Sequence, residues 1–141
     1  MSYFNPSQAR QDWRTAKADF EAKIQTAKVN TSAEILLSRE GRKDLGPLLD
    51  SIDSDEKTIA RYKESEGQGP KLNAARKIKL EHVTKARAAV ATYMKIMEDL
   101  RQRKLYPTLD AALKGVQNAL MKIWTPLDSE YKELNAALRP R

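Results

Sequence analysis

The feature that most constrains the fold is a stretch of 35 residues, 71–105, that contains neither glycine nor proline. Much of it consists of Ala, Leu, Lys, Arg and Glu, which are good helix formers. Gly69-Pro70 precedes the stretch and Pro107 follows it, and both residue types interrupt helices. A single helix over 71–105 would be roughly 50 Å long. The remaining elements of the 141-residue chain would have to pack along such a rod.

The N-terminal half of the chain predicts three shorter helices. Apolar residues recur there at intervals of three and four, and no segment shows the alternation typical of strands. The first helix is expected over about 8–30, with Ser7 as its cap. The second would begin at Thr31-Ser32 and end near Gly41, and the third would run from Pro47 to about Glu66.

The C-terminal part predicts two more helices. Tyr106-Pro107-Thr108 would end the long helix and cap a helix over about 109–124. Thr125-Pro126 would then supply the cap and first turn of a last helix. We therefore expect an all-α bundle of five to six helices around the central helix 71–105. It would form a single all-helical domain over 1–141, with N-terminal helices in 1–66, a Gly/Pro break at 67–70, and the long basic helix and C-terminal helices in 71–141.

The long helix carries a broad apolar sector. At 100° per residue its members span about 160°, wider than the stripe of an ordinary surface helix. This width predicts that the helix is the spine of the bundle, with Tyr93 and Met97 at the centre of the core. The members of the sector are Ile78, Val83, Ala86, Ala89, Val90, Tyr93, Met94, Ile96, Met97 and Leu100.

The positive charge of the chain is concentrated on this same helix. The formal net charge is +7, and residues 67–107 alone carry 10 Lys/Arg against 3 Asp/Glu. Lysine and arginine are almost never fully buried without partners. Where they fall within the apolar sector, at both ends of the helix, we expect the helix to leave the core and present them outward. The candidate nucleic-acid-binding residues are Lys71, Arg76, Lys77, Lys79, Lys85, Arg87, Lys95, Arg101, Arg103 and Lys104.

Residues for catalysis or metal binding do not form a recognisable pattern. The chain has no cysteine, and its single histidine, His82, falls in the predicted core sector, where a hydrogen-bonded boundary role is expected. The acids around Asp53 and Asp55 miss the spacing of a calcium loop. Gly67-Gln68-Gly69 is followed by Pro70 and follows no strand, so it is not a dinucleotide motif. We expect no enzyme activity, no metal site and no cofactor.

The charge pattern favours contacts with a phosphate backbone, which are independent of base sequence. We expect a non-enzymatic structural protein that binds nucleic acid and self-assembles with it into a nucleoprotein. DNA is the expected form of the nucleic acid. In layout alone, a small basic helical chain is similar to the coat proteins of filamentous DNA viruses of archaea, which implies a viral coat subunit. The partners would be nucleic acid and either further copies of the chain or a similar helical subunit.

An alternative function belongs to another class of protein. Residues 44–66 carry 7 acids and 3 bases, so they offer a surface of opposite sign to 67–107. The chain could be a helical protein–protein interaction module, such as an adaptor, chaperone or immunity-type bundle with an acidic partner. If the acidic and basic segments meet within one subunit, the basic surface is partly neutralised. The start of the chain does not resemble a signal peptide, and no apolar stretch could span a membrane, so an intracellular or virion location is expected.

Overall fold

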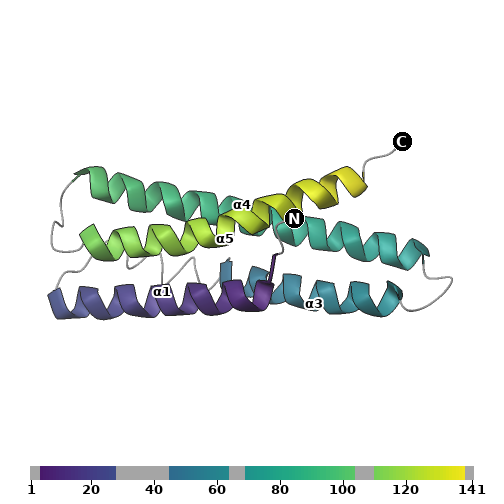
Figure 1. Cartoon of the computed structure of the whole chain (residues 1–141), viewed down its shortest axis with the longest axis horizontal. Helices are drawn as coiled ribbons and strands as arrows, with labels where there is room; N and C mark the ends of the chain where they lie inside the picture. The colour runs from purple at the N-terminus through teal and green to yellow at the C-terminus, as the bar shows by residue number, and fades with distance from the viewer. Residues whose placement is uncertain (1–3, 28–44, 64–68, 104–109, 139–141) are drawn as a thin grey trace.

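The computed structural model describes residues 4–27, 45–63, 69–103 and 110–138. Within these ranges every regular element is a helix, which confirms the all-α class. The helices are α1 (Pro6–Ala27), α3 (Gly46–Lys63), α4 (Gly69–Arg103) and α5 (Asp110–Ala137), labelled in Figure 1.

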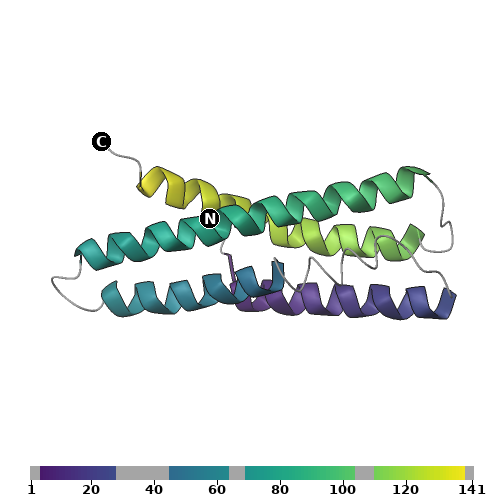
Figure 2. The ribbon, with the colours of Figure 1, turned by 180° about the vertical axis from the view of Figure 1, so that it is seen from behind.

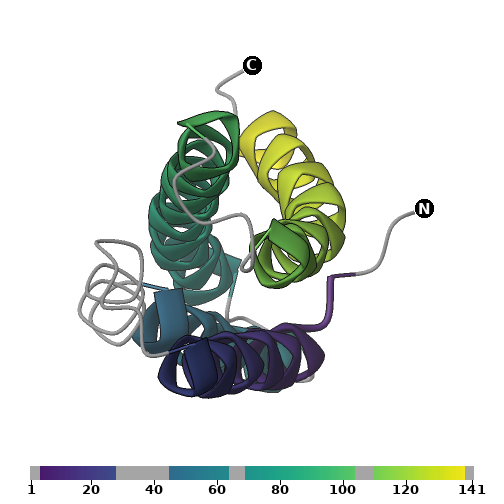
Figure 3. The same cartoon turned by 90° about the vertical axis from the view of Figure 1, so that its left-hand side faces the viewer.

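α4 is the spine along which the other described helices are arranged. It packs against both α3 and α5, while α1 packs against α5 and α3. Figure 1 shows α1 and α3 following one another along one side of the molecule, and Figure 2 shows α4 running along the opposite side from behind. Viewed end-on in Figure 3, α4 and α5 lie side by side above α1 and α3.

The core follows a narrow stripe on α4. Its buried residues recur at intervals of three and four, which places them on one face of the helix. They are Ala75, Lys79, Val83, Ala86, Val90, Tyr93 and Met97. Tyr93 stacks on Trp13 of α1, with the ring centroids 5.4 Å apart. The predicted central positions of Tyr93 and Met97 are confirmed, since both are almost fully buried.

The apolar sector of α4 is narrower than its sequence predicts. Ile78 was expected in the core, but half of its surface is exposed. The buried positions on either side of it are Ala75 and Lys79. The stripe therefore passes through Lys79, a charged residue that an analysis of apolar spacing does not count as a core position. For this reason the sequence pattern favoured the neighbouring isoleucine.

The first helix is capped by a different residue from the one predicted. The backbone N–H of Gln8 donates to Oδ1 of Asn5 at 3.0 Å, and α1 begins at Pro6. Asn5 is therefore the N-cap and Pro6 occupies the first helical position, where its missing N–H has no cost. Ser7, predicted as the cap, lies inside the first turn.

The two helices predicted at the C-terminus form one continuous helix, so the expected helix count is wrong here. Pro126 lies inside α5, and Thr125 is not a cap, because its hydroxyl donates to the carbonyl of Met121 at 3.3 Å. A proline in a helix costs about 3 kcal/mol, whereas burying one leucine side chain gains about 1.5–3 kcal/mol. Leu127 and Leu134 are both buried beyond Pro126 and offset that cost. Figure 1 shows α5 changing direction along its length.

Some of the sequence predictions fall outside the described residues. The helix expected from Thr31-Ser32 to Gly41 is one of them, as is the break at Tyr106-Pro107-Thr108. The start of α4 is described, and Pro70 lies in its first turn. Pro47 likewise lies in the first turn of α3, as predicted.

The core position of Met97 predicts a large loss of stability on truncation. Met97→Ala should lower the free energy of unfolding by about 2–5 kcal/mol, because the side chain is fully buried and its removal leaves a cavity. Met121 is 48% exposed, so Met121→Ala provides a matched control with a change within about 0.5 kcal/mol. Denaturant unfolding measures both variants. Equal losses would contradict the packing of α4 described above.

Candidate nucleic-acid interface

The cations of α4 divide into two groups according to their position around the helix. Three of them face neighbouring helices and form ion pairs with α3 or α5; we call these the seam cations, Lys79, Arg87 and Arg101. Four others are exposed, Lys77, Lys85 and Lys95 on the side turned away from the buried stripe and Lys71 at the N-terminal end of the helix; we call these four the outer lysines. The helical period places Lys77, Lys85 and Lys95 on a different side of α4 from its buried residues, because residues spaced by three or four share a face.

Lys79 joins three helices. Its side chain is 9% exposed, and its Nζ pairs with Oε1 of Glu130 on α5 and, at 3.4 Å, with Oε1 of Glu56 on α3. The sequence-based expectation that Lys79 leaves the core is therefore wrong. The pair of carboxylates compensates the buried charge, which is the condition under which a lysine can be buried. Its ammonium group is directed into the bundle and away from an external phosphate.

The two carboxylates around Lys79 are not equivalent. The pKa of Glu56 is raised, chiefly by burial and further by the charges of Glu130 and Asp53, although the charge and hydrogen bond of Lys79 act in the opposite direction. Glu56 is 27% exposed and Glu130 is 17% exposed. A raised pKa in the folded state means that the stability contributed by Glu56 is present at low pH and is lost as the pH rises through that pKa. Glu130, which also accepts a hydrogen bond from Lys79, is the less exposed of the two partners.

Within the described ranges, the charged and aromatic partners of Arg87 all come from α5. Its Nε donates to Oδ1 of Asp128 at 2.7 Å, and this hydrogen bond is the main reason that the pKa of Asp128 is lowered. The guanidinium carbon lies 4.9 Å from the centre of the Trp124 ring and 4.5 Å from that of Tyr131. Both contacts are within the range of cation–π attraction. Arg87 therefore joins α4 to α5 through charge and through packing.

Arg101 joins α4 to α5 near the C-terminal end of α4. Its Nε lies 3.3 Å from Oδ1 of Asp110, and its Nη1 donates to Oε1 of Gln117 at 2.7 Å. Gln117 in turn donates to Glu98 at 3.0 Å. Of the other two cations predicted at this end, Lys104 and the side chain of Arg103 lie outside the described part of the chain.

The acidic segment 44–66 meets the basic helix within one subunit. Glu56 pairs with Lys79, and Asp55 of α3 lies 2.6 Å from Nδ1 of His82. The histidine is half-buried at the boundary between α3 and α4, as the sequence predicts. These contacts occupy one of the ten candidate cations and leave the outer lysines unpaired.

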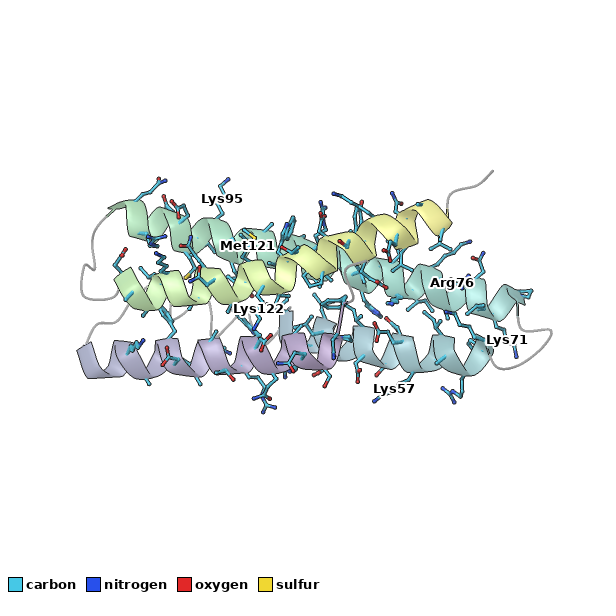
Figure 4. The ribbon with its side chains drawn as sticks, in the orientation of Figure 1. Lys57, Lys71, Arg76, Lys95, Met121 and Lys122 are labelled. Carbon is cyan, nitrogen blue, oxygen red and sulfur yellow. The ribbon has the colours of Figure 1, made fainter. Side chains whose placement is uncertain are left out.

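The outer lysines form the largest group of uncompensated charge on α4. All four are exposed, and within the described ranges none of them has an ion pair. Glu81 is the single acid in the sequence between Lys71 and Lys95. The four lysines extend along about 36 Å of the helix. Arg76 is half-buried and also has no ion pair with a described residue. Figure 4 shows Lys95 projecting away from the bundle and Lys71 at the opposite end of α4.

Sequence reasoning missed two exposed cations on α5. Lys114 and Lys122 are exposed, and no acid lies between them in the sequence. They went unnoticed because residues 108–141 as a whole carry almost balanced charge, with 5 Lys/Arg and 4 Asp/Glu. The spacing of these lysines by eight residues was the available signal, because two steps of four keep residues on one side of a helix.

The division of the cations predicts unequal effects of truncation on stability. Lys79→Ala should lower the free energy of unfolding by about 1.5–3 kcal/mol, because Glu56 and Glu130 lose the group that compensates them. The two glutamates keep some contact with water, so the loss stays below the 3–5 kcal/mol of a fully buried pair. Lys77→Ala, two residues away on the exposed side, should change it by less than about 0.5 kcal/mol. Thermal or denaturant unfolding measures the difference, and similar values for the two variants would contradict the assignment.

Sites of other kinds are not found in the described ranges. They hold no group of three or more His, Asp or Glu placed to bind a metal ion. None of the described helices is long and apolar enough to cross a membrane. Comparisons of the chain with protein-family models, with curated proteins and with solved structures find no match.

Proposed function

We propose that this protein binds nucleic acid through the phosphate backbone, independently of base sequence, and that the outer lysines of α4 make the contacts. The observation that carries the proposal is the row of four exposed lysines with a single acid among them. Lysine ammonium groups bind phosphates as point charges and carry no base-specific geometry. The predicted self-assembly and coat role remain predictions, and duplex DNA is the form of nucleic acid that we propose to test.

The structure supports a smaller contact set than the ten residues expected from the sequence. Lys79, Arg87 and Arg101 are engaged by glutamate and aspartate of α3 and α5. A phosphate would have to displace those carboxylates before it could use these cations. Lys71, Lys77, Lys85 and Lys95 need no such exchange, and Arg76 is available beside them.

The alternative of an interaction module that docks through charge is less well supported. It uses the acids of 44–66 as a surface complementary to the basic helix of another subunit. Asp55 and Glu56 already face His82 and Lys79 of their own chain, which leaves fewer acids for a contact between subunits. This pairing also neutralises one cation of the basic helix. That cation is Lys79, which is one of the seam cations and not one of the outer lysines.

The proposal predicts steep salt dependence. If the outer lysines neutralise four phosphates, the log–log slope of affinity against salt should be about −3.6, a loss of roughly 150-fold between 50 and 200 mM salt. Fluorescence anisotropy with a labelled duplex of about 30 base pairs measures the slope. Lys77→Gln/Lys85→Gln/Lys95→Gln should flatten it by about two to three units, because each lysine accounts for about one unit. Glutamine preserves helix propensity.

A second triple variant controls for net charge. Lys23→Gln/Lys57→Gln/Lys63→Gln removes the same three charges from exposed positions on α1 and α3, and Figure 4 shows Lys57 pointing away from α4. This control should keep the steep slope of the wild-type protein. Binding that is insensitive to salt, or equal weakening by the two triple variants, would refute the proposed interface.

A further inference from the structure

The described surface carries a second basic strip, on α5. Lys114, Asn118 and Lys122 follow one another at intervals of four residues, so they lie on one side of the helix. All three are exposed, and we call them the α5 strip. Lys114 and Lys122 form no ion pair with residues of the described ranges. Asparagine side chains, like lysines, are common donors to phosphate oxygens.

The α5 strip and the outer lysines point to different sides of the molecule. α4 and α5 pack against each other, and their contact is occupied by the seam cations with Asp110, Asp128 and Glu130. Neither the outer lysines nor the lysines of the α5 strip take part in the ion pairs of this contact. Figure 3 shows the two helices side by side end-on, and in Figure 4 Lys122 lies where α5 borders α1, while Lys95 projects from α4 at the opposite edge of the molecule.

Two separate basic faces permit binding of two nucleic-acid segments. Two packed helices are together about 20 Å thick, whereas the screening length at 0.1 M salt is about 10 Å. The repulsion between two duplexes separated by the thickness of these helices would thus be largely screened. One duplex cannot easily serve both faces, because its persistence length of about 150 base pairs resists wrapping around so thin a rod.

We infer that the protein bridges two duplexes, one on the outer lysines of α4 and a second on the α5 strip. This inference rests on the proposed function, because it adds a second binding face for the same class of ligand. The strip has fewer cations than α4, so the second duplex binds more weakly. At one phosphate per lysine, its salt slope is about −1.8.

An acid on α1 modulates the second face. A shallow groove of about 440 Å³ separates α1 from α5, and Asp12 and Lys122 both line it. Asp19, also in the groove, pairs with Lys23 at 3.3 Å. Asp12 accepts a hydrogen bond from Gln8 at 2.9 Å but has no ion pair with a described residue. Its charge therefore opposes phosphate binding at Lys122.

The test measures capture of one duplex by another. A duplex of about 30 base pairs is fixed to beads at about 50 mM salt, and a second, labelled duplex is added together with the protein. The wild-type protein should retain the label. Lys114→Gln/Lys122→Gln should reduce capture by about tenfold or more, while anisotropy still detects one duplex on the outer lysines. Asp12→Asn should increase capture, and Lys57→Gln/Lys63→Gln, with the same loss of charge on α3, should leave it as in the wild type.

The outcomes separate this inference from the function on which it rests. Binding of a single duplex without capture of a second would overturn the inference and leave the proposed function standing. Capture by Lys114→Gln/Lys122→Gln equal to that of the wild type would also overturn it, because bridging would then arise from association between protein copies. Failure of the wild-type protein to bind any duplex would refute both.

Discussion

The pairing of buried Lys79 with Glu130 and Glu56 is the interaction on which the rest of the structure depends. It lies in the hydrophobic stripe of α4, between buried Ala75 and Val83, and joins α4 to α3 and α5. An isolated ammonium group in that position would be costly to desolvate. Together with the buried apolar residues of the stripe, the contact sets the rotation of α4 about its own axis. That rotation determines which cations face neighbouring helices and which face outward.

Because of this rotation, the cations of α4 have two different roles. Arg87 and Arg101 continue the row begun by Lys79, and each meets an acid of α5. Lys77, Lys85 and Lys95 lie on the other side of the same helix, Lys71 lies at its N-terminal end, and all four remain exposed. In a chain with a net charge of +7, some cations can thus form ion pairs between helices while others remain exposed to an external anion. Net charge alone does not distinguish the two uses.

The sequence predicts those features that depend on helical period and on strong local signals. It placed α4 as the spine and Tyr93 and Met97 in the core, because apolar spacing and the lack of glycine and proline are local properties. It failed at Lys79, at Ile78 and at Pro126, where tertiary contacts outweigh the local preference. The burial of Lys79 depends on Glu130, which is 51 residues away, and no local pattern reveals such a partner. Lys114 and Lys122 were missed because charge was counted by segment instead of by helix face.

The most direct test of the account is a comparison of lysine reactivity in the free protein and in the protein with duplex DNA. Limited acetylation followed by mass spectrometry measures each side chain separately. The account predicts that Lys79 resists acetylation in both states, because it is buried and paired with glutamates. It predicts that Lys71, Lys77, Lys85 and Lys95 react readily in the free protein and become protected when duplex DNA is added. Rapid reaction of Lys79, or outer lysines that react equally with and without DNA, would contradict it.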